Sequence, residues 1–285
     1  TLMTRCFKQH PIINECLLKL EEILTTNKCK TYSDKFRTGL RFLKVKLIDN
    51  KLQLVFITGR DGLKEEIVKE ISQLPHVASI FMSVNTSKHQ EFDELGYSKL
   101  YGATRLELHD DKNQYLVSVK SKLPENIEMM WKQNQTIKSL VQDSQKIISL
   151  NCGIGLLELN LDQEIVAIDE KRYQIDDAKL NAKYLKKENV TFIAGDLDSK
   201  IVTYAKKKVY DTLIIQNERY GLSDTIKDTI KIAKFKTIIY ACQSHSTLAK
   251  DLADLEKNYK LERIIGLDTS CHNSYLTTIV KLVRK

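Results

Sequence analysis

The spacing of apolar residues changes partway along the chain, from mixed helical and alternating patterns to a regular succession of strand and helix. Residues 11–27 carry apolar positions at helical spacing and predict one amphipathic helix. Residues 39–59 alternate with a period of two on both sides of Asp49-Asn50, which indicates a β-hairpin. The same reading predicts, further along, a helix at 63–74 and strands at 77–84, near 99–108 and at 114–120. This first part is expected to be α+β.

A linker is expected near Leu123-Pro124-Glu125, and beyond it short apolar runs alternate with amphipathic segments. The predicted strands are 146–151, 164–168, 190–194, 211–215 and 236–241. The predicted helices are 134–142, 171–187, 197–207, 223–233 and 246–257. Such alternation is typical of a doubly wound α/β sheet. The last two runs, 261–267 and 275–283, follow each other without a helix, which predicts an antiparallel pair.

The most informative stretch runs from Ser149 to Gly155, where an apolar run stops at a Gly-x-Gly turn. The next predicted strand ends in Asp169, and the strand after that is followed by Gly195-Asp196. Glycines at such a turn let the backbone approach a nucleotide-like ligand, and the acid after the next strand accepts hydrogen bonds from ribose hydroxyls. The spacing predicts an adenosyl-type pocket; the plainer interpretation is an ordinary tight turn.

Composition and charge narrow the class of protein. The chain of 285 residues is 42% hydrophobic and 29% charged, without a run of about 18 apolar residues that would span a bilayer. Its net charge of +8 favours a polyanionic partner, solvated helix faces being the alternative. Six cysteines form no C-x-x-C pair, so we expect neither disulfides nor a zinc site, and a reducing compartment.

Several short motifs occur in the order of one enzyme family. They are Tyr32-Ser33-Asp34-Lys35, Leu100-Tyr101-Gly102, Cys152-Gly153-Ile154-Gly155, Asn181-Ala182 and Ser246-Thr247-Leu248-Ala249-Lys250-Asp251-Leu252. Together with Asp169 and Gly195-Asp196, they make residues 32–285 resemble the S-adenosylmethionine-dependent RNA 5-methyluridine (uracil-C5) methyltransferase family. The resemblance implies a class I methyltransferase sheet, Rossmann-like with an antiparallel terminal strand, after a smaller α+β domain. The family's N-terminal β-barrel and four-cysteine cluster have no counterpart in this sequence.

The resemblance fails at the residues that carry the reaction. In the family a cysteine thiolate attacks C6 of uracil, and a base then removes the C5 proton. Gln243 stands at the nucleophile position, Cys242 lies one residue early, and Thr277 stands at the base position. Cys242 is therefore either a displaced nucleophile beside His245, part of a weaker Cys–His dyad, or a small apolar residue at a strand end. Groups that surround the cofactor in the family are also replaced: Ser149 and Gln216 stand where the family has acids, and Lys132 stands where it has a glutamine.

These observations predict an RNA-binding protein with a uracil-C5 methyltransferase fold that is catalytically inactive and serves as a structural or assembly component of a ribonucleoprotein. The alternative is an active tRNA or rRNA uracil-C5 methyltransferase with Cys242 as nucleophile. S-adenosylmethionine is expected to bind weakly or not at all, and no metal is expected. The expected cofactor-binding residues are Gly153, Gly155, Asp169, Asp196 and Gln216. The expected RNA contacts are Arg41, Lys44, Lys46, Lys206, Lys207, Lys208, Arg219 and Tyr220, with Tyr275 a further stacking candidate.

The expected organisation is a helical segment at 1–29, an α+β domain of RNA-binding type at 30–125 and a methyltransferase-like domain at 126–285. The expected partners are rRNA or tRNA and other ribonucleoprotein proteins, without a membrane. Mitochondrial and cytoplasmic locations both fit a reducing compartment. The sequence begins at Thr1 rather than at a methionine, so a further segment, such as a targeting sequence, could precede it.

Overall fold

The computed structural model describes residues 6–87, 96–269 and 276–285. They belong to two compact units, Thr1–Lys120 and Ser121–Lys285. Each unit has its own sheet and its own buried core. Tyr275, the further stacking candidate, lies outside the described residues.

The first unit contains a mixed sheet in which strands follow one another in chain order, β1-β2-β3-β4, and a separate pair, β5-β6. Its elements are α1 (Pro11–Thr26), β1 (Leu40–Ile48), β2 (Lys51–Thr58), α2 (Glu65–Ser72), β3 (Val77–Val84), β4 (Ser98–Gly102), β5 (Arg105–His109) and β6 (Gln114–Ser118). The turn between β1 and β2 places Asp49 and Asn50 at φ 45° and 61°, as tight hairpins require. The predicted first helix and hairpin are confirmed.

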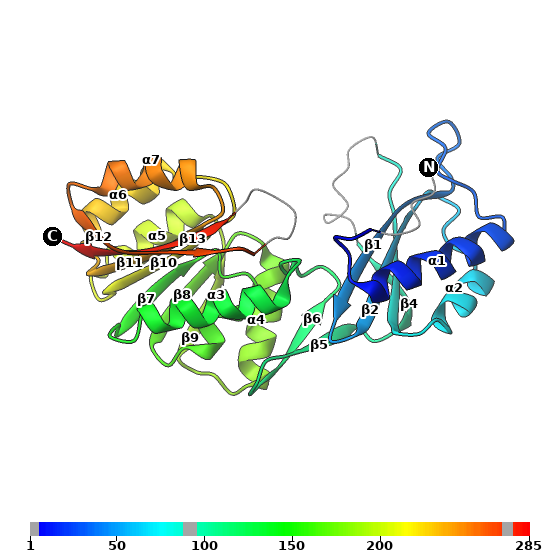
Figure 1. The fold of residues 1–285 in the computed structure, drawn as a ribbon, viewed down its shortest axis with the longest axis horizontal. Helices are drawn as coiled ribbons and strands as arrows, with labels where there is room; N and C mark the ends of the chain where they lie inside the picture. The colour runs from blue at the N-terminus through cyan, green and yellow to red at the C-terminus, as the bar shows by residue number, and fades with distance from the viewer. Residues whose placement is uncertain (1–5, 88–95, 270–275) are drawn as a thin grey trace. The chain divides into compact units, whose positions relative to one another are not determined.

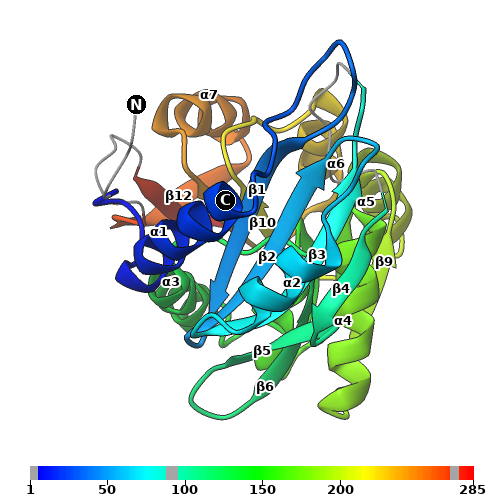
Figure 2. The same ribbon diagram turned by 90° about the vertical axis from the view of Figure 1, so that its right-hand side faces the viewer.

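Both helices of this unit pack on the same face of its sheet (Figure 2). Leu20 of α1 and Ile71 of α2 share a buried cluster with Leu54 and Phe56 of β2. Burial of each such side chain stabilises the fold by about 1.5–3 kcal/mol relative to exposure. The apolar positions in the amphipathic pattern of residues 11–27 therefore mark the face of α1 that packs against the core of the first unit.

The strand predicted near 99–108 is wrong, because the structure divides it into β4 and β5. Gly102 ends β4 with φ +75°, and a Cβ there would lie 2.0 Å from the carbonyl oxygen of Ala78. The chain turns at this glycine, after which β4 stays paired with β3 and β5 pairs with β6. The apolar residues on the two sides of the turn, Leu100-Tyr101 and Leu106, are close enough in the sequence to be taken for one strand.

The second unit is built on a sheet of order β12-β13-β11-β10-β7-β8-β9. Its elements are α3 (Ile127–Leu140), β7 (Lys146–Leu150), η1 (Glu158–Asn160), β8 (Glu164–Asp169), α4 (Arg172–Tyr184), β9 (Val190–Ala194), α5 (Leu197–Ala205), β10 (Thr212–Asn217), α6 (Asp224–Ala233), β11 (Thr237–Cys242), α7 (His245–Leu255), β12 (Tyr259–Leu267) and β13 (Thr277–Arg284). Strands β7 to β11 run parallel to one another, whereas β13 is antiparallel to both β11 and β12. The predicted class I methyltransferase sheet with an antiparallel terminal strand is confirmed.

Helices cover both faces of this sheet: α5, α6 and α7 lie on one side and α3 and α4 on the other (Figure 1). The layer of α5, α6 and α7 buries alternate residues of the strands, among them Leu150, Ile215, Tyr240 and Cys242. Residues between them, such as Ser149 and Gln216, point to the opposite face, because successive side chains of a strand alternate.

The helix predicted at 134–142 starts earlier than expected, at Ile127. The side chain of Asn126 accepts a hydrogen bond from the backbone nitrogen of Met129 at 3.0 Å, which satisfies one of the free N–H groups at a helix start. The prediction therefore missed an Asn cap placed directly after the linker.

The order of strands reverses between β7 and β10. From β7 the chain builds outward through β8 and β9, and from β10 it builds in the other direction through β11. Ligands of doubly wound sheets bind at the carboxyl ends of the strands at such a reversal. Among the described helices, none is long and apolar enough to cross a membrane.

Candidate functional site

The glycine motif forms a tight turn at the carboxyl end of β7. Gly153 and Gly155 have φ of +57° and +77°, a region in which side chains are strained. A Cβ at Gly155 would lie 2.4 Å from the ring of Phe192, whereas one at Gly153 would meet its nearest neighbour, in Gln174, at 3.8 Å. Gly155 is therefore required for packing, and Gly153 leaves its backbone open to approach.

Asp169, the last residue of β8, is hydrogen-bonded to this turn. Its Oδ2 accepts the backbone N–H of Gly153 at 2.9 Å, and its Oδ1 accepts that of Lys171 at 2.8 Å. The backbone N–H of Gly195 donates to the carbonyl oxygen of Asp169 at 3.0 Å. Burial raises the pKa of Asp169, and the two N–H donors oppose that rise. The structure thus brings together the glycine turn, the Gly195 turn and Asp169, the acid that the sequence predicts to bind the ribose hydroxyls.

Asp196 caps a helix in this structure. Its Oδ2 accepts the backbone N–H of Ser199 at 2.8 Å at the start of α5. The residue is otherwise exposed. Its position directly after Gly195 leaves it beside the group formed by Gly153 and Asp169.

A carboxylate that the sequence did not single out lies among the strand ends. Glu158 is completely buried, and its Oε1 accepts the hydroxyl of Ser149 at 2.6 Å and the amide of Gln216 at 3.4 Å. Its Oε2 has no hydrogen-bond partner in the part of the chain that the structure describes. Burial raises the pKa of Glu158 to about 7. The available signal was a lone acid within an apolar run, residues 154–161.

Cys242, the last residue of β11, is also completely buried. Its side chain belongs to the cluster under α5, α6 and α7, on the opposite face from Ser149 and Gln216. The sulfur lies 3.8 Å from the carbonyl oxygen of Glu218 and 3.5 Å from that of Ser244. Burial raises the pKa of the thiol, which disfavours the thiolate that a nucleophile needs.

The two substituted catalytic positions make structural contacts. Gln243 donates its backbone N–H to the carbonyl oxygen of Glu218 at 2.7 Å. Thr277 is buried, and its hydroxyl lies 2.8 Å from the hydroxyl of Thr269. A threonine hydroxyl has one donor and two lone pairs but no tendency to take a proton near neutral pH. This arrangement supplies no base at position 277.

Comparison with known proteins gives relatives of one kind. The chain is 28% identical over 279 residues to an uncharacterised RNA methyltransferase of Halalkalibacterium halodurans, which covers 93% of this chain and 60% of that protein. It is 26% identical over 294 residues to an uncharacterised RNA methyltransferase of Enterococcus faecalis, covering 98% of this chain and 64% of that protein. The chain is therefore similar in sequence to proteins named RNA methyltransferases. No family model matches the sequence.

Solved structures agree with this relationship at the level of fold. The Pyrococcus abyssi tRNA (uracil-54, C5)-methyltransferase, in complex with S-adenosyl-L-homocysteine, superposes with a TM-score of 0.81 at 20% identity, covering 99% of this chain and 70% of that one. The structure of aTrm5 with tRNALeu gives a TM-score of 0.54 at 13% identity, covering 99% and 80%. The resemblance read from the sequence is confirmed, and the chain spans about 60–64% of the length of the two curated relatives.

On strand β1, two of the expected RNA contacts, Arg41 and Lys46, donate hydrogen bonds to backbone carbonyl oxygens of the first unit. Arg41 donates to the carbonyl oxygens of Ser87 at 2.7 Å and Asn85 at 3.3 Å, with its guanidinium 4.9 Å from the ring of Tyr32. Lys46 donates to the carbonyl oxygen of Ser118 at 2.9 Å. A phosphate would have to compete with these acceptors. Lys44, two residues before Lys46 on the same strand, is half-buried.

The other candidate RNA contacts lie at opposite ends of strand β10 in the second unit. Lys206, Lys207 and Lys208 are exposed and precede β10, whereas Arg219 and the 84% exposed Tyr220 follow it. Because β10 has six residues, about 20 Å of strand separates the two groups. Tyr220 and Arg219 are therefore at the carboxyl ends of the strands, where the glycine turn also lies. The three lysines are at the amino ends.

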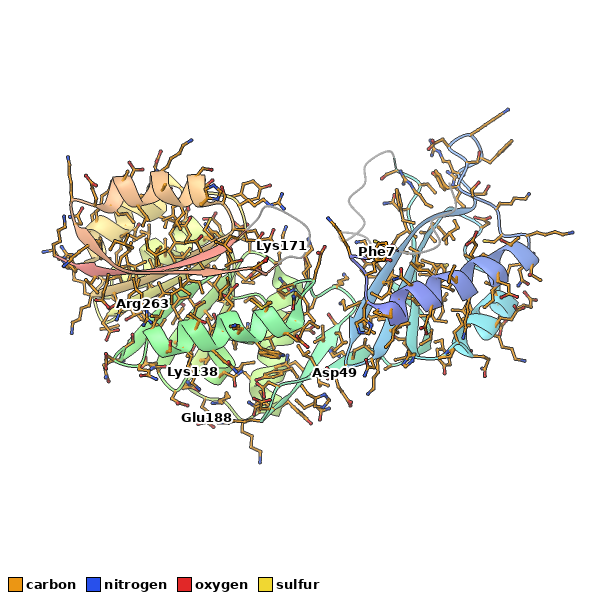
Figure 3. The ribbon with its side chains drawn as sticks, in the orientation of Figure 1. Phe7, Asp49, Lys138, Lys171, Glu188 and Arg263 are labelled. Carbon is orange, nitrogen blue, oxygen red and sulfur yellow. The ribbon has the colours of Figure 1, made fainter. Side chains whose placement is uncertain are left out.

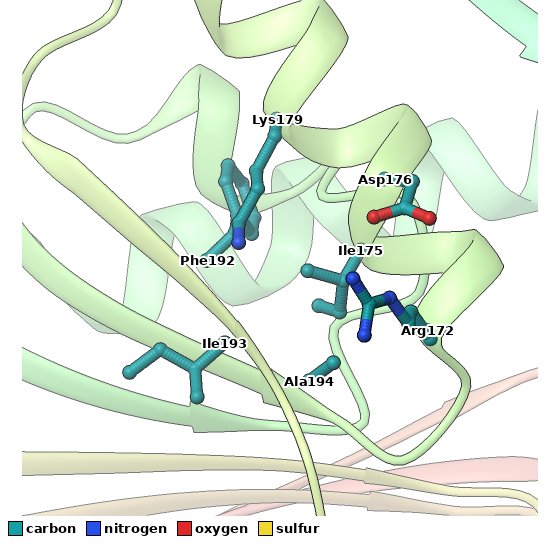
Figure 4. A pocket seen from close by; sticks show the side chains of 7 residues that line it. All are labelled: Arg172, Ile175, Asp176, Lys179, Phe192, Ile193 and Ala194. Atoms are coloured by element: carbon teal, nitrogen blue, oxygen red, sulfur yellow. The ribbon is translucent and has the colours of Figure 1, made fainter.

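A pocket of about 280 Å³ lies between α4 and β9 (Figure 4). Arg172, Asp176 and Lys179 line it from α4, and Phe192 and Ala194 from β9. Ala194 directly precedes the Gly195-Asp196 turn, so the pocket borders residues that the sequence predicts to bind the cofactor. No sequence motif had indicated it.

Among the residues that the structure describes, no group of three or more His, Cys, Asp or Glu side chains could hold a metal ion. Lys132, at the position of a cofactor-facing Gln in the family, is exposed on α3. Asn134, two residues later, is buried.

Proposed function

We propose that this chain binds RNA through a class I methyltransferase fold and does not methylate uracil C5 by a cysteine thiolate. In this proposal it is a structural or assembly component of a ribonucleoprotein containing rRNA or tRNA. The observation that carries the proposal is the position of Cys242, whose thiol is buried in the layer under α5, α6 and α7. Names of relatives and the tRNA complex among the fold neighbours support RNA as the partner.

The chemistry of the uracil reaction explains why this position matters. A thiolate must attack C6 so that C5 becomes a carbon nucleophile, and a base must then take the C5 proton. Cys242 would have to leave the core and ionise against a raised pKa. A group other than Thr277 would then have to accept the proton, because the Thr277 hydroxyl is not a base and is hydrogen-bonded to that of Thr269.

The cofactor part of the proposal rests on retained geometry. Gly153, Gly155, Asp169 and Gly195 are held together by backbone hydrogen bonds at the strand ends. This arrangement suits an adenosine moiety, with Asp169 for the ribose hydroxyls. When bound, S-adenosylmethionine would supply an activated methyl group. The S-adenosyl-L-homocysteine complex of the Pyrococcus abyssi enzyme supports this ligand class.

An active uracil-C5 methyltransferase with Cys242 as nucleophile is the second candidate. The names of the relatives and the likeness to the Pyrococcus abyssi enzyme favour it. Cys242 lies at the carboxyl end of β11, paired in register with Asn217 of β10. A local shift of the residues after β11 would be required to turn its thiol toward the face of Ser149.

The experiment that separates the candidates is methyl transfer from tritium-labelled S-adenosylmethionine to unmodified tRNA and rRNA transcripts. Our proposal expects RNA binding by filter retention without label at uracil C5. Label at C5 that disappears in Cys242→Ala, and persists in Cys16→Ala, would establish the second candidate. Cys16 is a matched control because it is a buried cysteine of the first unit.

A further inference from the structure

The carboxylate of Glu158 is buried beside Ser149 and Gln216, the two strand positions at which the family has acids. Ser149 and Gln216 replace groups that would hold the cofactor, and this loss was the reason to expect weak binding. The structure places the carboxylate of Glu158 between these same two residues, at 2.6 Å from Ser149 and 3.4 Å from Gln216. An acid absent from the strand positions is thus supplied by η1.

The location of Glu158 relates it to the ligand site. Ser149 belongs to β7 and Gln216 to β10, the two strands between which the sheet order reverses. Ligands of this sheet class bind outside the carboxyl ends of strands at that reversal. The glycine turn and Asp169 lie at the same strand ends.

The charge of Glu158 is poorly neutralised by its surroundings. The groups facing it are Ser149 from β7, Gln216 from β10, Asp169 from β8 and Cys152 from the glycine turn. Of these, Asp169 raises the pKa of Glu158 and the hydroxyl of Ser149 lowers it. No cation is among the described groups that shift it. A buried carboxylate without a cationic partner is costly, unless a ligand provides the positive charge.

We propose that Glu158 is the positioning residue for the cationic part of an S-adenosylmethionine-type ligand, acting as a buried negative charge beneath the ends of β7 and β10. The charge acts across the intervening Ser149 and Gln216, since the carboxylate itself is covered. This inference rests on the adenosyl-type cofactor site of the proposed function. The cation is either the ammonium, present in S-adenosylmethionine and S-adenosylhomocysteine, or the sulfonium, present only in the former.

The charge role makes ligand affinity depend on pH in a defined direction. Below its pKa of about 7, Glu158 is protonated and attracts no cation. Between pH 8 and pH 6 the ionised fraction falls about tenfold. Because the protonated form should keep about a tenth of the affinity of the ionised form, as Glu158→Gln does, the affinity for S-adenosylmethionine should fall about fivefold. Titration of the ligand itself affects all variants equally. The ratio of the wild-type affinity to the Glu158→Gln affinity at each pH therefore reports only the ionisation of Glu158.

The test is calorimetric binding of S-adenosylmethionine, S-adenosylhomocysteine and neutral methylthioadenosine at pH 6 and pH 8. We expect Glu158→Gln to lose affinity for S-adenosylmethionine at pH 8 on the order of tenfold, as for one unit charge near a ligand cation at a protein-like dielectric. Methylthioadenosine should bind both proteins equally. An equal loss for S-adenosylhomocysteine identifies the ammonium, and no loss for it identifies the sulfonium.

Glu188→Gln is the matched control, because Glu188 is exposed and lies beyond the carboxyl end of α4, whereas Lys171 precedes that helix (Figure 3). It removes the same charge far from Ser149 and should leave binding unchanged. A second variant, Ser149→Asp with Glu158→Ala, should recover the S-adenosylmethionine affinity that Glu158→Ala alone loses, because it returns the acid to β7.

The outcomes separate the two proposals. Folded Glu158→Gln that binds S-adenosylmethionine as wild type does, at both pH values, overturns the role of Glu158 alone. An equal loss for neutral methylthioadenosine also overturns it, since Glu158 would then shape the site rather than attract a cation. Wild type that binds none of the three ligands overturns the cofactor site of the proposed function, and this inference with it.

Discussion

The hydroxyl of Tyr240 on β11 donates a hydrogen bond of 2.8 Å to Oδ2 of Asp251 on α7, with both side chains buried. The same oxygen accepts the backbone N–H of Leu222 at 3.0 Å. Asp251 therefore ties a strand, a helix and the chain segment after β10 at one point. Its place in the sequence motif from Ser246 to Leu252 is explained by this structural role.

Tyr240→Phe should destabilise the second unit by about 1–2 kcal/mol, because it removes one partner from a buried carboxylate. Denaturant unfolding followed by circular dichroism measures this. Tyr220→Phe is the matched control, since the side chain of Tyr220 is 84% exposed, and it should leave the midpoint unchanged. Equal midpoints for both variants would refute the role given to Asp251.

Gly155→Ala should be much more damaging than Gly153→Ala. Both positions have positive φ, which costs a side chain about 1–2 kcal/mol. Only Gly155 also places its Cβ 2.4 Å from Phe192. Thermal unfolding of the two variants checks the order, and Phe192→Leu should partly rescue Gly155→Ala. A larger loss of stability in Gly153→Ala would contradict the packing argument.

The stability of the unliganded protein should decrease as pH rises from 5 to 8, relative to Glu158→Gln. Burial raises the pKa of Glu158 to about 7, so the folded state keeps a proton that the unfolded state has already lost. The stabilising effect of that proton is full below the unfolded pKa and is lost as pH rises through the folded pKa. The difference should reach about 3 kcal/mol.

Urea unfolding of both proteins at pH 5 and pH 8 measures this difference. Groups other than Glu158 titrate alike in the two proteins and cancel. If the wild type and Glu158→Gln show the same pH dependence, the carboxyl of Glu158 has an ordinary pKa in the folded protein.

Cys242 should react slowly with iodoacetamide in the native protein at pH 7.5. Burial both covers the sulfur and raises its pKa, and the thiolate is the reactive form. Mass spectrometry of tryptic peptides should find the partly exposed Cys6 alkylated long before Cys242. Rapid labelling of Cys242 would instead favour the active enzyme as the function.

Replacement of Lys206, Lys207 and Lys208 by alanine tests whether RNA reaches the amino ends of the strands. If each lysine contacts a phosphate, the slope of log affinity against log salt should decrease by about one unit per residue. Tyr220→Ala should weaken binding with the slope unchanged, because stacking on a base releases no counterion. Retention of the wild-type slope in the triple variant would exclude this edge from the RNA contact.

The sequence predicted the second unit well because its signals are local. Apolar runs such as 164–168 and 190–194 end within one residue of β8 and β9, and the glycine turn lies where the motif placed it. Glu158 escaped notice because burial and contact with Gln216, 58 positions away in the chain, are properties of the folded sheet. The direction of the Cys242 side chain was likewise decided by which face of β11 it occupies.

The order of strands has a consequence for biosynthesis. β12 emerges from the ribosome before β13, yet its pairing partner in the sheet is β13, which lies between β12 and β11. Until β13 is translated, β12 has no hydrogen-bonding neighbour and the edge of β11 is open. Any folding intermediate in which β13 has not yet inserted therefore exposes an unpaired strand and an open sheet edge, both of which favour aggregation.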